Sequence, residues 1–249
     1  MFLESDDEDL AFIAADGDGL VMDLYYPEAR AECSPAVVIV HGYNDVGFER
    51  MLGSRFKDMP STVAWGQRMA ASGMAAIAYT NRQPLADAHA VLRHIRQNAA
   101  TLGIDADRIA LWACSGHGPV ALSLLMTEAK LRCAALLYPM TLDLDGSSAI
   151  AEARQMFRFE NACAGNGIDD LPDDVPLFIA RAGKDEMPRL NEALDRFVAG
   201  ALARNLPVSL VNHAQGPHAF DLMDDSDTSR EIIRQTLAFL RFHLEKKID

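Results

Sequence analysis

The sequence predicts an α/β fold with a mostly parallel central sheet of about eight strands and helices on both faces. Short runs of β-branched or apolar residues alternate along the chain with amphipathic segments of helical period. The 249 residues are 49% hydrophobic, which is enough for a large core. Neither a repeat nor a linker interrupts the pattern, so we expect residues 1–249 to form a single domain.

The first two predicted strands form a hairpin. Apolar runs at 10–15 and 20–26 flank Asp16-Gly17-Asp18-Gly19, and turn residues between two such runs are typical of a hairpin. We expect this hairpin to be antiparallel to the rest of the sheet. Continuous apolar runs, typical of strands covered on both faces, follow at 36–40, 74–79, 109–113, 133–138, 177–180 and 208–211.

Amphipathic helices are predicted between these strands. Between Leu85 and Leu102, apolar residues recur at alternating gaps of three and four, and Gly103 supplies a C-terminal stop. Further helices are predicted at 190–202 and at 228–244, where Thr228 and Glu231 have the spacing of a capping box. In such a sheet ligands bind beyond the carboxyl ends of the strands, so the residues after each strand are the candidates for a site.

Charge and cysteine content exclude several classes of function. The net charge of -13 disfavours nucleic acid and anionic membrane surfaces as partners. The four cysteines form no C-x-x-C pair and have no accompanying His cluster, so neither a metal site nor a disulfide framework is expected. The first residues lack the basic start and apolar stretch of a secretory signal. We therefore expect a cytoplasmic protein.

The residues that carry chemistry lie at the end of the predicted strand 109–113. Cys114-Ser115-Gly116-His117-Gly118 follows that strand directly and leads into the helical run that starts near Val120. A serine on such a sharp strand-to-helix turn exposes its hydroxyl above the sheet. The N–H of Gly116 then points toward a developing oxyanion.

This segment resembles the nucleophile elbow of the α/β-hydrolase family, usually written G-x-S-x-G. Three further features resemble the family: the Asp105–Ile109 lead-in to the elbow, the His41-Gly42-Tyr43 segment after the third strand, and the order of the candidate triad residues. The nearest branch is the dienelactone-hydrolase or small-esterase group. The resemblance implies an α/β-hydrolase fold in which Ser115 is the nucleophile, His218 the base and Asp185 its partner. It further implies an oxyanion hole built from the N–H groups of Gly116 and Tyr43.

Several alternatives stay open at this point. Cys114 is the rival nucleophile, although it would place the bulky Trp112 where the elbow needs a small residue. Glu186 and Asp143 are rivals of Asp185. His117 occupies a position where the family has a small residue, and we expect its side chain to point away from the strand, toward the pocket or solvent.

The segment 139–176 is the candidate for a short lid insertion. Its side chains, among them Met140, Phe157 and Phe159, either line a substrate pocket together with His117 or pack as ordinary core.

The resulting hypothesis is hydrolysis of a carboxylic ester, or a related acyl bond of a small molecule, through an acyl-enzyme and without metal or cofactor. The alternatives are a thioesterase or peptidase on the same scaffold, or a non-catalytic or decayed binding protein. The sequence leaves the physiological substrate and the oligomeric state undetermined.

Overall fold

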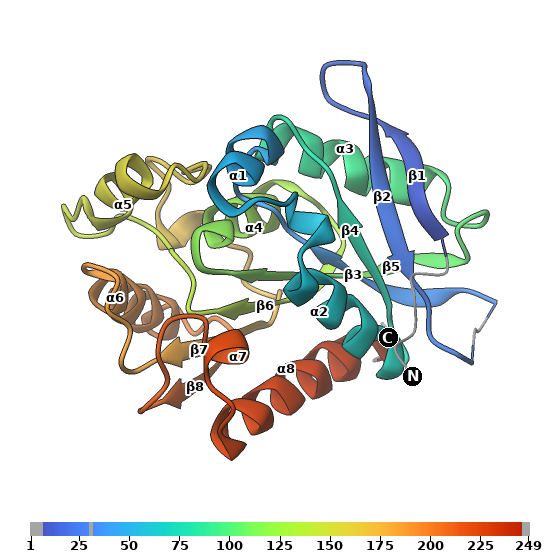
Figure 1. Ribbon diagram of the computed structural model, residues 1–249. Helices are drawn as coiled ribbons and strands as arrows, with labels where there is room; N and C mark the ends of the chain where they lie inside the picture. The colour runs from blue at the N-terminus through green and yellow to red at the C-terminus, as the bar shows by residue number, and fades with distance from the viewer. Residues whose placement is uncertain (1–6, 30–31, 246–249) are drawn as a thin grey trace.

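The structure is a computed structural model that describes residues 7–29 and 32–245 (Figure 1). Residues 1–6, which carry most of the expectation about a secretory signal, lie outside the described part. One eight-stranded sheet runs through the molecule in the order β1-β2-β4-β3-β5-β6-β7-β8. Its strands are β1 (Asp7–Ile13), β2 (Gly19–Tyr25), β3 (Ser34–Ile39), β4 (Ala75–Tyr79), β5 (Ile104–Cys114), β6 (Leu131–Leu137), β7 (Leu177–Ala182) and β8 (Val208–His213).

The mostly parallel eight-stranded sheet that the sequence predicts is confirmed. All neighbours from β4 to β8 pair in parallel. The expectation that both hairpin strands run against the rest is wrong, because β1 is antiparallel to β2 and β2 is antiparallel to β4. Among the described strands only β2 is reversed. The last strand also differs from the expected buried type, since β8 lies at the sheet edge and is largely exposed.

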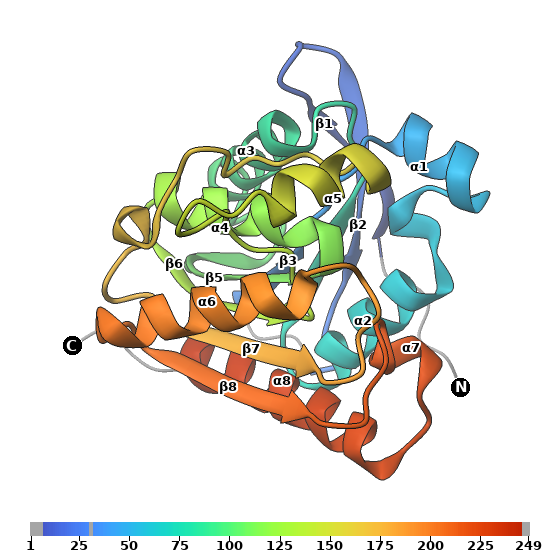
Figure 2. The same ribbon diagram turned by 90° about the vertical axis from the view of Figure 1, so that its left-hand side faces the viewer.

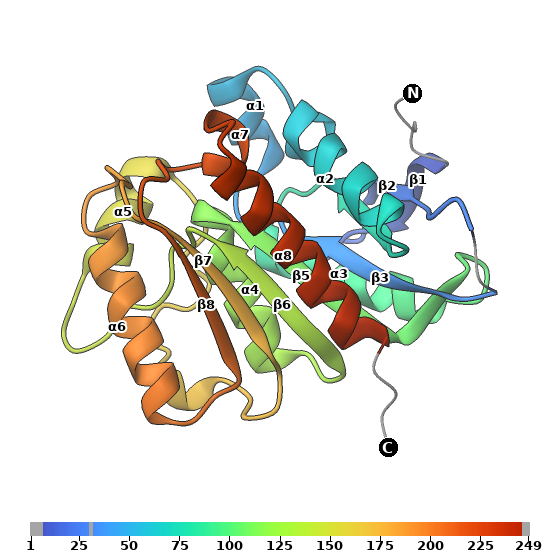
Figure 3. The ribbon, with the colours of Figure 1, turned by 90° about the horizontal axis from the view of Figure 1, so that it is seen from below.

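Helices cover both faces of the sheet, as Figures 1 and 3 show. Residues of α2 and α8 pack on one face with Trp112 and Phe178, and residues of α3, α4 and α6 pack on the other with Leu111 and Ile179. The helical elements are α1 (Asp45–Leu52), η1 (Phe56–Asp58), α2 (Pro60–Ala71), α3 (Pro84–Gln97), η2 (Ser115–His117), α4 (Gly118–Thr127), α5 (Ala149–Phe157), η3 (Ile168–Asp170), α6 (Leu190–Ala203), α7 (Phe220–Met223) and α8 (Asp227–Glu245).

Two helix ends differ from their sequence predictions. The α3 helix ends at Gln97 rather than at Gly103, and the Asn98 amide donates to the His94 carbonyl oxygen at that end. The α8 helix begins one residue before Thr228, and the Ser226 hydroxyl accepts the N–H of Ser229. Local side-chain caps therefore set both ends, which apolar periodicity alone does not locate.

The candidate lid segment, 139–176, contains α5 and η3. The α5 helix packs beside α6, as Figure 2 shows, and its buried residues Ile150 and Ala153 form a small cluster with Met140, Phe159 and Leu190. No helix within the described ranges is both long and apolar enough to span a membrane.

Candidate active site

The turn after β5 has the geometry of a nucleophile elbow. Ser115 has a φ of 48°, a left-handed conformation that is uncommon for a residue other than glycine. The β5 strand ends at the preceding residue, and η2 followed by α4 begins at the serine. The strained backbone lifts the hydroxyl out of the sheet at the carboxyl end of a central strand.

The structure brings Ser115, His218 and Asp185 together. The Ser115 hydroxyl lies 2.9 Å from His218 Nε2, and His218 Nδ1 lies 2.6 Å from Asp185 Oδ2. The Asp185 side chain is fully buried, and its Oδ1 accepts the Met187 N–H at 2.9 Å. With Nδ1 as the donor to the carboxylate, Nε2 is free to accept the serine proton.

Contacts between the loops after β7 and β8 position the histidine and the aspartate. The Gly183 N–H donates to the His213 carbonyl oxygen at 2.8 Å, and the Lys184 N–H donates to the Gly216 carbonyl oxygen at 2.9 Å. A Cβ on Gly183 would lie 2.6 Å from the Ala214 carbonyl oxygen, so only glycine permits this approach. The two loops are thereby joined just before Asp185 and His218.

The rival residues occupy other environments. Both oxygens of Asp143 accept backbone N–H groups at the start of α5, those of Ile150 at 2.8 Å and Ala151 at 2.9 Å. Glu186 is exposed. Burial raises the pKa of the Cys114 thiol, and the nearby Asp221 carboxylate raises it further. A thiol held in its protonated form is a poor nucleophile.

The loop after β3 packs directly on the elbow. A Cβ on Gly42 would lie 2.4 Å from the Gly116 carbonyl oxygen, and the Tyr43 ring lies over Gly116. The N–H groups of Tyr43 and Gly116 donate to no protein acceptor within the described residues. Both are therefore available to a ligand atom beside the serine.

The His117 side chain holds this loop in place. Its Nδ1 accepts the N–H of Gly42 at 2.9 Å, and its ring stacks on Phe56 with a centroid separation of 4.3 Å. The residue lines the cavity described below, as expected for a side chain that faces the pocket, and it is buried, with 4% exposed. Burial lowers the pKa of His117 to about 3, so the ring is neutral at physiological pH.

His41 has a structural position behind the loop. It is fully buried, stacks on Phe56 at 4.4 Å, and its Nδ1 lies 2.5 Å from the Asn81 amide nitrogen and 3.3 Å from Asp45 Oδ1. Burial raises the pKa of Asp45 to about 6, although N–H groups such as that of Asn81 counter the effect. Titration of Asp45 therefore falls close to physiological pH.

A cavity of about 130 Å³ opens beside Ser115 and His218. Aromatic and apolar side chains form most of its wall, and Asp221 is the only carboxylate in the lining. The wall comes from α1, η1, α2, the end of β5, η2, the residue after β6, the loop after β8, and α7. Its lining residues are Phe48, Phe56, Met59, Ser61, Thr62, Trp65, Trp112, Cys114, Ser115, His117, Tyr138, His218, Ala219, Asp221 and Leu222.

The cavity differs from the pocket that the sequence predicts. Of the four predicted pocket residues only His117 lines it; Met140 and Phe159 are buried in the cluster beneath α5, and Phe157 packs against that cluster. Sequence reasoning missed Trp65 and the other helix-borne aromatics because their spacing resembles ordinary core. Asp221 carried a usable signal, since it lies three residues after the candidate base.

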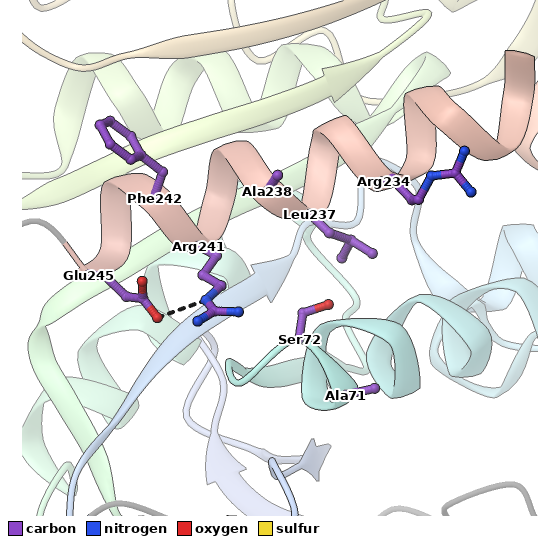
Figure 4. Close-up of a pocket in the computed structure, with 8 residues that line it drawn as sticks. All are labelled: Ala71, Ser72, Arg234, Leu237, Ala238, Arg241, Phe242 and Glu245. Carbon is purple, nitrogen blue, oxygen red and sulfur yellow. Dashed lines mark hydrogen bonds and ion pairs between the residues drawn. The ribbon is translucent and has the colours of Figure 1, made fainter.

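A larger hollow of about 500 Å³ lies between the end of α2 and α8 (Figure 4). Its two arginines are paired: Arg234 bonds Glu231 at 2.6 Å, and Arg241 bonds Glu245 at 2.8 Å. Its lining contains none of the triad residues, so this surface has no part in the site. No group of three His, Cys, Asp or Glu within the described residues is arranged to hold a metal ion.

Comparisons with known proteins agree with the fold described above. The family model BD-FAE matches residues 22–176. The fold is similar to an α/β-hydrolase enzyme from the metagenome of Lake Arreo, Spain, at a TM-score of 0.73 and 18% identity, covering 98% of this chain and 84% of that one. A bacterial heroin esterase matches at a TM-score of 0.73 and 17% identity, covering 98% of this chain and 87% of that one. A thermostable esterase from Pseudomonas putida matches at a TM-score of 0.75 and 16% identity, covering 97% of this chain and 84% of that one. No curated protein matches the sequence.

Proposed function

Because the chain belongs to the BD-FAE family and has the α/β-hydrolase fold, we propose that it hydrolyses carboxylic esters of small molecules through Ser115, His218 and Asp185. The observation that carries the proposal is the pair of contacts on His218, 2.9 Å to the Ser115 hydroxyl and 2.6 Å to the Asp185 carboxylate. An unactivated serine is a weak nucleophile, and a base within hydrogen-bond reach, itself oriented by a third group, supplies the activation.

In the acylation step, Ser115 Oγ attacks the ester carbonyl while His218 Nε2 takes the hydroxyl proton. The imidazolium is then stabilised by the Asp185 carboxylate, whose side chain is fully buried. His218 gives the proton to the departing alkoxide, and the alcohol leaves. Water attacks the acyl-enzyme in the second step, with His218 again acting as the base.

The N–H groups of Tyr43 and Gly116 are the proposed oxyanion hole. Both lie at the elbow without a protein acceptor, and α4, a helix of 10 residues, begins just beyond Gly116. Donors fixed before the reaction stabilise the tetrahedral oxyanion without reorganisation, and the positive end of the helix dipole adds to the effect.

A fluorophosphonate probe tests the proposed function. The wild-type protein should be labelled once per chain and Ser115→Ala should not be, whereas Cys114→Ala should be labelled like the wild type. p-Nitrophenyl esters of increasing chain length, together with a thioester and a peptide substrate, then define the bond that is cleaved. Folded protein that binds ligands but is never labelled would favour the binding-protein alternative. Labelling that survives in Ser115→Ala but disappears in Cys114→Ala would identify Cys114 as the nucleophile.

The compartment and the finer branch are also part of the proposal. All four cysteines are unpaired, which supports a reducing environment such as the cytoplasm. The dienelactone-hydrolase or small-esterase branch rests on the sequence resemblance alone.

A further inference from the structure

Asp221 places an unneutralised carboxylate in the wall of the cavity beside the nucleophile. Its Oδ1 accepts the Tyr138 hydroxyl at 2.5 Å, and its Oδ2 accepts Trp65 Nε1 at 2.8 Å. Both donors are neutral groups. Asp221 forms no ion pair with a lysine, arginine or histidine of the described chain, and no lysine or arginine lines the cavity.

The two cationic residues that flank the cavity-lining Phe56 are paired elsewhere. The Lys57 ammonium binds Asp23 at 2.8 Å, and Arg55 binds Asp58 at 2.5 Å. A carboxylate offers about four acceptor sites, of which Asp221 uses two. The half-buried side chain therefore has acceptor positions that no described protein group occupies.

Several aromatic rings share the wall with this carboxylate. Trp65 and Trp112 lie 4.7 Å apart between ring centroids, and Tyr138, Phe48 and Phe56 also line the cavity. Aromatic faces attract cations through the ring quadrupole, and a cage of such rings is the usual receptor for substituted ammonium groups. The net charge of -13 also draws cations toward the protein.

We propose that this cavity is a subsite for a compact substituted-ammonium group carried by the ester substrate. The inference rests on the proposed function, because the subsite places the substrate carbonyl at Ser115. The carboxylate would supply the charge and the rings would supply the contact surface. The volume of about 130 Å³ limits the cationic group to a small one such as trimethylammonium.

Tryptophan fluorescence tests binding without catalysis. The chain has two tryptophans, Trp65 and Trp112, and both line the cavity, so their emission reports on its occupancy. Titrating the Ser115→Ala variant with choline should change the emission saturably. The neutral isostere 3,3-dimethylbutan-1-ol should bind at least about tenfold more weakly, as expected for a desolvated cation. Equal affinities would overturn the proposal.

The kinetic arm compares acetylcholine with 3,3-dimethylbutyl acetate. We expect the wild type to favour the cationic ester in kcat/KM by about tenfold or more, and Asp221→Asn to bring the ratio of the two to within about twofold. The matched control is Asp225→Asn, which removes the same charge from an exposed side chain and should leave the ratio unchanged. Tyr138→Phe, which removes a hydrogen bond but keeps the charge, should retain the preference.

These outcomes separate the two proposals. The proposal is overturned if the wild-type ratio of the two kcat/KM values is near one, or if Asp221→Asn leaves that ratio unchanged. Asp221 would then serve only to hold Tyr138 and Trp65. If Asp221→Asn fails to fold, the choline titration of Ser115→Ala still decides the inference. If the protein binds choline selectively but hydrolyses no ester and is not labelled by the fluorophosphonate, the ammonium site is retained and the proposed function is rejected.

Discussion

Replacing His117 by phenylalanine should impair the oxyanion loop while leaving the triad intact. The substitution keeps an aromatic ring against Phe56 but removes the Nδ1 acceptor of the Gly42 N–H. A buried N–H left without an acceptor costs about 1–3 kcal/mol. If the free energy of unfolding falls by about 2 kcal/mol, we expect the melting temperature of a domain of this size to fall by about 4–8 °C.

The kinetic effect follows from the position of Tyr43 next to Gly42. A backbone shift there moves the Tyr43 N–H away from the oxyanion, and loss of one such donor costs about 100-fold or more in kcat. Because this contact forms in the transition state, KM should change little. His117 has a pKa of about 3, so the loss should be constant between pH 5 and 9.

The matched variant is His117→Asn, whose amide oxygen can stand where Nδ1 stands and accept the same N–H. Steady-state kinetics with a p-nitrophenyl ester and thermal unfolding should show that asparagine recovers most of kcat. A control His94→Phe, on α3, should retain activity. The reasoning is refuted if His117→Phe keeps wild-type kcat, or if His117→Asn is no better than His117→Phe.

Three other substitutions test the site and its support. Asp185→Asn should lower kcat by about 10⁴-fold through the wrong His218 tautomer, measured against the same ester, and a loss under about tenfold would assign the role to another carboxylate. Between pH 4 and 6, Asp45 keeps in the folded state a proton that the unfolded chain releases, so stability falls as pH rises through this window. Asp45→Asn should remove that fall, which amounts to up to about 3 kcal/mol in the free energy of unfolding measured with urea. An unchanged pH dependence of this free energy would contradict the assignment. Lys57→Met should cost about 3–5 kcal/mol in the same assay, because it leaves the buried Asp23 carboxylate without its 2.8 Å partner, whereas Lys130→Met, an exposed control, should cost under about 1 kcal/mol.

The sequence was enough to predict which strands the candidate catalytic residues follow. Apolar runs marked the parallel strands, and all carboxyl ends of a parallel sheet share one edge, so Ser115, Asp185 and His218 were expected at the same edge. The elbow was equally readable, because its strand, turn and helix are consecutive. Local periodicity could not decide the direction of β1 or the exposure of β8, since both depend on neighbours in the sheet.

The cavity was decided by tertiary structure alone. Trp65 and Phe48 lie on amphipathic helices, where the sequence pattern of a pocket-lining aromatic residue is the same as that of a core residue. They line the cavity because α1 and α2 fold over the elbow. The sequence pattern of Met140 and Phe159 is equally ambiguous, and the structure places both in the core. His117 was visible as a departure from the elbow pattern. Its role depends on Gly42, 75 residues away, because a hydrogen bond between distant segments leaves no periodic trace in either of them.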